Sequence, residues 1–138
     1  PIQKGCAEVL AEGTEVALFA IGSMVETAWQ VRKKLAEKGI PTTVVNARFA
    51  MPLDKNCLRK LAESHPLLVT MEENVASGGF GEHVAAFLEE EALHTKVLRI
   101  AIPDCFVEHG SVGELKKALG LDADSVTEKI LAELPEEL

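Results

Sequence analysis

The stretch VALFAIGSMVETAWQVRKKL, residues 16–35, decides the fold. Its first six residues are apolar without interruption, which is typical of a strand buried on both faces of a sheet. Gly22 and Ser23 interrupt the strand, and four apolar residues then recur at helical spacing: Met24, Ala28, Val31 and Leu35. A buried strand followed directly by an amphipathic helix predicts one unit of a parallel α/β sheet.

The same alternation continues along the chain. Further apolar or β-branched runs lie at residues 42–45, 67–71 and 97–102, and helical patterns separate or follow them at 54–62, 84–92, 111–119 and 124–134. Residues 7–10 are apolar and precede a turn signal at Glu12 and Gly13, so we expect a hairpin that adds one antiparallel edge strand. The sequence therefore predicts an α/β fold of three layers, helix, sheet and helix, with a five-stranded, mainly parallel sheet and one antiparallel edge strand.

Length and composition restrict the class of protein. The 138 residues fit a single domain over residues 1–138, and no apolar stretch approaches the roughly 18 residues that a membrane span needs, so we expect a soluble protein without a membrane partner. The net charge of −8, with basic residues scattered among the acids, argues against nucleic acid as a partner. Because the chain begins at Pro1 and not at Met, we expect a piece of a longer polypeptide.

Cysteine and histidine residues show no catalytic or metal-binding spacing. The three cysteines, Cys6, Cys57 and Cys105, lie in or beside apolar runs and form no CxxC motif, which favours a reducing, intracellular location and a packing role. None of the four histidines has the spacing of a metal ligand pair, and His109 precedes a helical pattern, where a contact or capping role is expected.

Ligands and partners of parallel α/β sheets meet the loops at the carboxyl ends of the strands. We expect those loops at Gly22 and Ser23, at 46–48, at 72–74 with the glycines that follow, and at Pro103 and Asp104. The candidate loop or domain-interface residues are Arg48, Asp54, Glu72, Glu73, Asn74, Gly78, Gly79, Gly81, Asp104 and His109.

Four of these candidates carry specific hypotheses. Adjacent strand residues point to opposite faces, so Glu72 and Glu73 are expected to serve in ionic or capping roles and not as a carboxylate pair. Arg48 is expected to tie its loop to Asp54, Glu72 or Glu73, and its removal to lower the melting temperature clearly. Asp54 is a predicted helix N-cap.

The glycines resemble a nucleotide-binding motif only in part. Gly79 and Gly81 match the first two glycines of a dinucleotide fingerprint, but Val84 stands where the third is needed. Positive φ angles and close packing at a helix start are therefore the favoured explanation over anion binding, with the Gly78–Gly81 segment as a flexible loop.

Four segments in order resemble one family. VALFAIGSMVETA, VVNARFAMPLD, LLVTMEENVASGGFGEHV and IPDCFVEHGSVGELKKALGLDADSV are similar to the C-terminal domain of transketolase-type thiamine diphosphate enzymes, over nearly the whole chain. The segments at 48–54 and 72–81 are shared widely in that superfamily. The tail at 102–110, followed by 119–122, resembles the 1-deoxy-D-xylulose-5-phosphate synthases in particular.

The resemblance implies a parent enzyme that condenses pyruvate with glyceraldehyde 3-phosphate and releases carbon dioxide, using thiamine diphosphate and Mg²⁺. In that family the cofactor lies between the first two domains, so no catalytic, cofactor-binding or metal-binding residue carries over to this chain. It also implies that this domain packs against the other domains and a second subunit in a homodimer, in the bacterial cytoplasm or in a plastid. We expect the domain alone to fold, to bind no cofactor and to be inactive.

Two alternatives remain open. One is the corresponding domain of a transketolase or of a 2-oxo acid dehydrogenase β subunit. The other is a free-standing flavodoxin-like module that binds an anion or a nucleotide at its strand-end loops.

Overall fold

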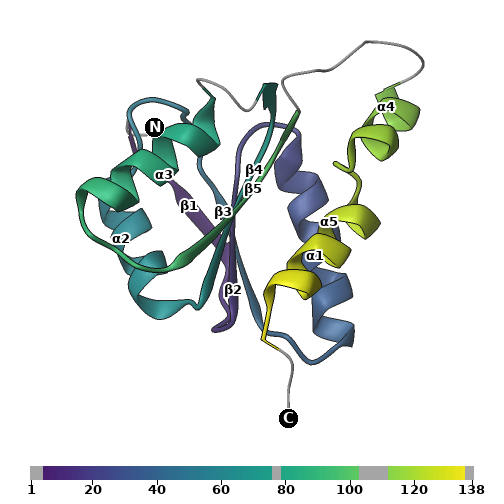
Figure 1. The fold of residues 1–138 in the computed structure, drawn as a ribbon, viewed down its shortest axis with the longest axis horizontal. Helices are drawn as coiled ribbons and strands as arrows, with labels where there is room; N and C mark the ends of the chain where they lie inside the picture. The colour runs from purple at the N-terminus through teal and green to yellow at the C-terminus, as the bar shows by residue number, and fades with distance from the viewer. Residues whose placement is uncertain (1–4, 76–78, 103–111, 136–138) are drawn as a thin grey trace.

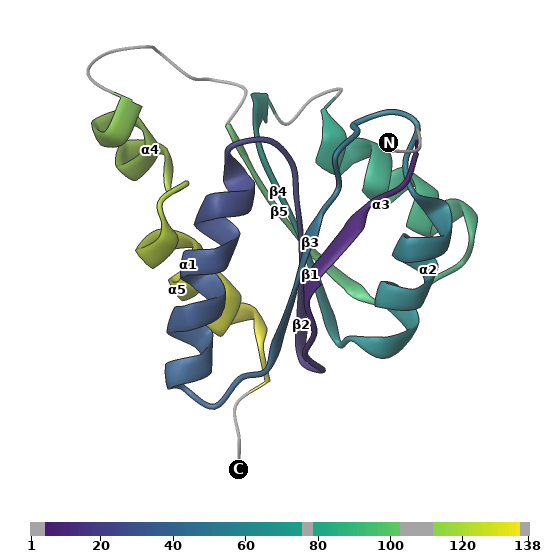
Figure 2. The ribbon, with the colours of Figure 1, turned by 180° about the vertical axis from the view of Figure 1, so that it is seen from behind.

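The computed structural model describes residues 5–75, 79–102 and 112–135. Ten elements follow one another: β1 (Glu8–Ala11), β2 (Val16–Ala20), α1 (Met24–Glu37), β3 (Thr42–Asn46), α2 (Lys55–Ser64), β4 (Leu67–Val75), α3 (Phe80–Glu90), β5 (Lys96–Ile102), α4 (Val112–Leu119) and α5 (Ala123–Glu133). Figure 1 shows the sheet between two helical layers, with α2 and α3 on one face and α1 and α5 on the other. The reverse view in Figure 2 shows the same layers, which confirms the predicted three-layer α/β fold.

The sheet has the order β1-β3-β2-β4-β5. Strands β2, β3, β4 and β5 run parallel, and β1 is antiparallel to its neighbour. The central strand β2 is fully buried along its length, because each of its faces packs against a helical layer. The five-stranded, mainly parallel sheet with one antiparallel edge strand is therefore confirmed.

The predicted hairpin between the first two strands is wrong. β1 pairs with β3 and not with β2, since β2 has β3 and β4 as its parallel partners on its two sides. The connection crosses the start of β3, where a side chain at Gly13 would meet the backbone nitrogen of Thr42 at 2.3 Å. Only glycine permits this crossing, which carries β1 to the free edge of β3.

Two apolar cores lie on the two faces of the sheet. On the face under α2 and α3, the rings of Phe19 and Phe80 stack with their centroids 5.4 Å apart. On the other face, the helical stripe of α1 that the sequence predicts is fully buried against the sheet and α5. In the part of the chain that the structure describes, no helix is long and apolar enough to cross a membrane.

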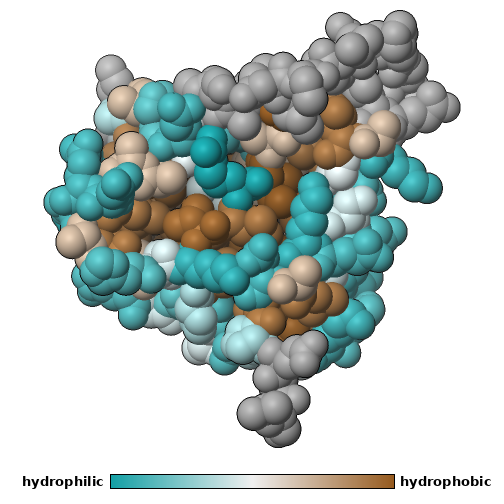
Figure 3. Space-filling view, viewed as in Figure 1, coloured by the Kyte–Doolittle hydropathy of each residue, from teal (hydrophilic) through white to brown (hydrophobic). Residues whose placement is uncertain are grey.

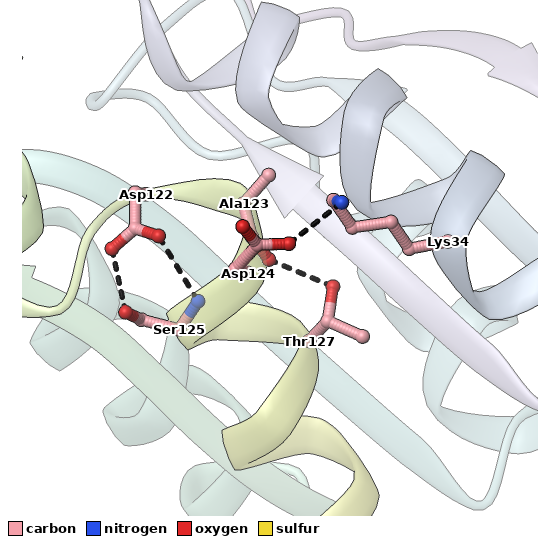
Figure 4. A network of polar contacts seen from close by, with 6 residues as sticks. All are labelled: Lys34, Asp122, Ala123, Asp124, Ser125 and Thr127. Atoms are coloured by element: carbon pink, nitrogen blue, oxygen red, sulfur yellow. Dashed lines mark hydrogen bonds and ion pairs between the residues drawn. The ribbon is translucent and has the colours of Figure 1, made fainter.

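Polar contacts define the start of α5 and link it to α1 (Figure 4). Asp122 caps α5 by accepting a hydrogen bond from the backbone of Ser125, and Thr127 donates to the carbonyl of Ala123 at 2.7 Å. Lys34 of α1 reaches across to Asp124 at 2.6 Å. This exposed ion pair contributes little energy, so the apolar stripe between the helices holds them together.

Candidate functional site

The carboxyl ends of the four parallel strands meet at one edge of the sheet, and most of the predicted site residues lie there. One boundary differs from the prediction. Glu72, Glu73 and Asn74 belong to β4, which continues to Val75, and not to a loop after it. The pairing of β4 with β5 is irregular between Met71 and Val75, so an apolar run ending at Met71 was an incomplete signal for this strand.

Glu72 is completely buried beneath the start of α3. Its carboxylate accepts hydrogen bonds from the backbone N–H of Phe80, at 2.9 Å, and from that of Gly81. These N–H groups open the helix and have no partner within it, so a negative charge is stabilised there by hydrogen bonding and by the helix dipole. The capping role predicted for one of the two glutamates is confirmed, and this carboxylate is engaged in holding α3 on β4.

Glu73 points away from Glu72 and is exposed. It forms an ion pair with Lys116 of α4 at 2.8 Å. The hydrogen bond from Lys116 lowers the pKa of Glu73 below its ordinary value of 4.5, against an opposing effect of burial, and Ser23 adds to the lowering. The ionic role predicted for the other glutamate is thus confirmed, while Lys116 is a partner that sequence reasoning missed.

Arg48 follows β3 and has a positive φ angle of 64°. Its backbone N–H donates to the side chain of Asn46 at 3.0 Å, and its guanidinium pairs with Glu8 of β1 at 3.2 Å. The prediction that Arg48 binds Asp54, Glu72 or Glu73 is therefore wrong about the partner. Because Glu8 is about half exposed, this ion pair is expected to add less than about 1 kcal/mol to stability.

Asp54 caps α2, as the sequence predicts. One carboxylate oxygen accepts from the backbone N–H of Cys57 at 3.0 Å, and the other accepts from that of Ala7 at 2.8 Å. The second contact joins α2 to the segment before β1, over a separation that no local pattern reveals. Asp54 is consequently a structural residue with both oxygens in use.

The glycines before and within α3 serve packing. Gly79 is the N-cap with an extended backbone, and α3 begins at Phe80, so Gly81 is helical and does not belong to a flexible loop. A side chain at Gly81 would meet oxygens of Glu72 and Thr70 at 2.8 Å. Close packing at the helix start is confirmed at Gly81, whereas positive φ is not the reason for either glycine. The predictions for Gly78, Asp104 and His109 lie outside the described residues.

A hollow of about 450 Å³ lies near the amino ends of the parallel strands, between β1 and α2. His65 is buried in its lining and bridges two elements, with Nε2 2.8 Å from Oγ1 of Thr43 and Nδ1 3.0 Å from the carbonyl of Leu61. The sequence carried no signal for the contact between Thr43 and His65, because the two residues are 22 positions apart in the chain. The contacts of His65 tie the end of α2 to the sheet.

Cys57 is also at this hollow, and burial raises the pKa of its thiol to about 11. A thiol with so high a pKa is almost entirely protonated at neutral pH and is a poor nucleophile. Cys6 forms no disulfide bond within the described part of the chain, and Cys105 lies outside that part.

The described residues supply no set of ligands for a divalent cation. In 5–75, 79–102 and 112–135, no three side chains of His, Cys, Asp or Glu come together in a way that could hold a metal ion. Among the described candidates, Glu72 and Asp54 accept from backbone N–H groups and Glu73 pairs with a cation. We therefore derive no catalytic step through Mg²⁺ or thiamine diphosphate in this part of the chain, and the expected absence of cofactor binding stays a prediction.

The fold and the sequence match one known class. The family model described as "Transketolase, C-terminal domain" matches residues 5–126, and the chain belongs to this family. A solved structure with the description "Split gene transketolase, inactive beta4 tetramer" superimposes on this chain with a TM-score of 0.89 at 31% identity. The match covers 95% of this chain and 43% of that one. A transketolase mutant of Pichia stipitis shares the fold, with a TM-score of 0.67 at 19% identity, over 94% of this chain and 18% of that one.

The similar sequences narrow the class further. A 1-deoxy-D-xylulose-5-phosphate synthase of Lachnoclostridium phytofermentans is 54% identical over 127 residues, which are 91% of this chain and 20% of that enzyme. The 1-deoxy-D-xylulose-5-phosphate synthase 1 of Geobacter metallireducens is 47% identical over 131 residues, or 94% of this chain and 21% of that enzyme. The resemblance to the C-terminal domain of these synthases is confirmed, and the chain spans about a fifth of their length.

Proposed function

We propose that this chain is the non-catalytic C-terminal domain of a 1-deoxy-D-xylulose-5-phosphate synthase. The observation that carries the proposal is the use of four polar side chains at the carboxyl edge as structural contacts. Glu72 caps α3, Asp54 caps α2, and Glu73 and Arg48 each form an ion pair. None of these groups is left to bind or activate a substrate, so the domain acts as a scaffold.

The parent enzyme would join pyruvate to glyceraldehyde 3-phosphate with loss of carbon dioxide, at the start of non-mevalonate isoprenoid synthesis. Thiamine diphosphate, held with Mg²⁺ by the other domains, would supply the chemistry of decarboxylation and carbon–carbon bond formation. The similarity to synthases of this name supports that reaction. We further propose that the parent is a homodimer in the bacterial cytoplasm, or in a plastid if the source is a plant.

An assay of the full-length parent tests this proposal. With thiamine diphosphate and Mg²⁺ present, pyruvate and glyceraldehyde 3-phosphate should give product and carbon dioxide, and a ketose phosphate in place of pyruvate should give none. A preference for a ketose donor would instead assign the chain to a transketolase. The similarity to the split gene transketolase structure supports this alternative. The 138-residue chain alone should give no product with either donor.

A further inference from the structure

The loop between β3 and α2 exposes apolar side chains at the carboxyl edge of the sheet. Its residues 49–53, with the sequence FAMPL, form what we call the apolar loop. Met51 is 61% exposed, more than the other exposed large apolar side chains of the described residues. Pro52 is exposed as well, and the other three residues of the loop are only half-buried. A run of apolar residues at the surface is typical of a contact with another part of a protein.

The polar groups around the apolar loop already have partners. Both carboxylate oxygens of Asp54 accept hydrogen bonds, and the guanidinium of Arg48 pairs with Glu8. Nζ of Lys55 lies over the ring of Phe87, 5.9 Å from its centroid. A partner at this loop is therefore bound by the burial of apolar surface and not by a specific charge, so it must present apolar side chains of its own.

The N-terminal segment of the chain lies against the same loop. A Cβ atom at Gly5 would be 3.3 Å from Cγ of Pro52, and the backbone N–H of Ala7 donates to Asp54 at 2.8 Å. Figures 1 and 2 show the segment before β1 and the loop between β3 and α2 together at one end of the sheet. The polypeptide thus reaches β1 by way of the apolar loop.

The identity of the partner follows from this path of the chain. A C-terminal domain is joined to the rest of its polypeptide through its N-terminal end, and this chain matches about a fifth of the length of its relatives. Four residues span at most about 14 Å, so any polypeptide ahead of Pro1 begins close to the apolar loop. The nearest large body of protein is then the domain that precedes this one.

Two other apolar surfaces lie away from the N-terminal segment. Trp29 is exposed on α1, which covers the opposite face of the sheet from α2. Figure 3 shows an apolar band along β5, whose apolar side chains are mostly half-buried. β5 is the edge strand farthest from β1, into which the N-terminal segment leads. Of these three surfaces, the apolar loop is the one that chain continuity places beside the rest of the parent.

We infer that the apolar loop is the surface on which the preceding domain of the parent enzyme docks, through apolar side chains of that domain. This inference rests on the proposed function, since it requires a longer parent enzyme. It names the contact surface that the proposed scaffold role needs. Met51 becomes a buried residue of that contact.

Oxidation by hydrogen peroxide tests the inference, because exposed methionines are converted to the sulfoxide more readily than buried ones. The chain has three methionines, and Met24 and Met71 are 0% exposed, so they are internal controls. In the 138-residue chain, shown to be folded by circular dichroism, Met51 should be oxidised much faster than either control. In the full-length parent, peptide mass spectrometry should show Met51 oxidised at least about tenfold more slowly than in the 138-residue chain.

Three outcomes would overturn the inference. One is equal oxidation of Met51 in the two proteins. Another is protection of Met51 in the 138-residue chain that grows with protein concentration, which would assign the loop to a second copy. The third is protection in the parent that is lost when the parent is diluted until its subunits separate, which would assign the loop to another subunit.

A matched pair of variants adds a second readout. Met51→Glu places a charge on the apolar loop, and Trp29→Glu makes the same change at another exposed apolar side chain. Hydrogen exchange of the amides of residues 49–53 should be at least about tenfold slower in the unmodified parent than in the 138-residue chain. Met51→Glu should remove this protection from the parent and Trp29→Glu should retain it, whereas retention in both variants would overturn the inference.

The two variants also require a check that the domain still folds. In the 138-residue chain both should melt within a few degrees of the unmodified chain, because each replaced side chain is largely at the surface. The amides of β2, which is fully buried, should stay equally protected in every protein.

Failure of the inference and failure of the proposed function are distinguishable. A full-length parent that does not use pyruvate and glyceraldehyde 3-phosphate would refute the proposed function. Oxidation of Met51 in that same parent would still report whether the apolar loop is covered.

Discussion

Replacement of Glu72 by alanine should destabilise the domain far more than the same replacement at Glu73. The two residues are adjacent in β4 and chemically identical, which makes each the control for the other. Glu72 is fully buried and accepts two hydrogen bonds from the start of α3, whereas Glu73 is exposed and pairs with a single lysine.

The magnitude follows from the contacts. In Glu72→Ala, the N–H groups of Phe80 and Gly81 lose a charged acceptor in a buried site, and each unsatisfied buried donor costs about 1–3 kcal/mol. Loss of the favourable charge at the helix N-terminus adds a few tenths to about 1 kcal/mol. Allowing for some relaxation, we expect a loss of about 2–4 kcal/mol in the free energy of unfolding. Glu73→Ala should cost less than about 1 kcal/mol, as is usual for exposed ion pairs.

Urea unfolding followed by circular dichroism measures both changes. With a dependence on urea of about 1–3 kcal/mol per molar, the midpoint for Glu72→Ala should fall by roughly 1–2 M, and that for Glu73→Ala by a few tenths. Equal losses for the two variants, or a loss under about 0.5 kcal/mol for Glu72→Ala, would refute the assignment of Glu72 as the cap of α3.

Other predictions concern charge, hydrogen bonding and thiol reactivity. The pKa of Glu73 is lower in the folded state than its ordinary value of 4.5, so its small contribution to stability should be present above pH 4.5 and lost as the pH falls through the folded pKa. Urea titrations should show the stabilities of the unmodified chain and of Glu73→Gln converging once the pH is below that folded pKa. The hydroxyl of Thr70 is buried without a hydrogen-bond partner among the described residues. The variant Thr70→Val should therefore have a free energy of unfolding up to about 1 kcal/mol higher than the unmodified chain. A decrease of more than about 1 kcal/mol in that free energy would contradict the absence of a partner. The pKa of the Cys57 thiol is raised to about 11 from an ordinary 9.0. At pH 8 this thiol should therefore react with iodoacetamide about 100-fold more slowly in the folded chain than in urea. Equal reaction rates in the two conditions, measured by peptide mass spectrometry, would contradict the burial of Cys57.

The sheet and the first helix were predictable from sequence because their signals are local. The run Val16–Ala20 is apolar on both faces, and the stripe of α1 follows at helical spacing, so tertiary packing agrees with local pattern. Asp54 was predictable for the same reason, since its capping contact with Cys57 spans three residues.

The errors at β1 and at Arg48 have a single origin. Once β1 is placed beside β3, Glu8 lies opposite Asn46, two residues before Arg48, and the ion pair between Glu8 and Arg48 follows. A hairpin with β2 would have kept Glu8 away from Arg48. Strand order is decided by which edges remain free after the central strands have paired, and no local pattern contains that information.

The roles of the two glutamates were partly predictable. The alternation of a strand indicates that one is buried and the other exposed, but not which helix each one meets. The partners Phe80 and Lys116 come from α3 and α4, so they depend on how the helices pack over the end of β4.

Calorimetric titration of the 138-residue chain with thiamine diphosphate and MgCl₂ tests most directly whether this domain is a scaffold without a cofactor site. We predict only the heat of dilution, at ligand concentrations up to the millimolar range, from a chain that circular dichroism shows to be folded. Saturable binding with a micromolar Kd would contradict this account, because it would require ligands for the diphosphate and the cation within the domain itself.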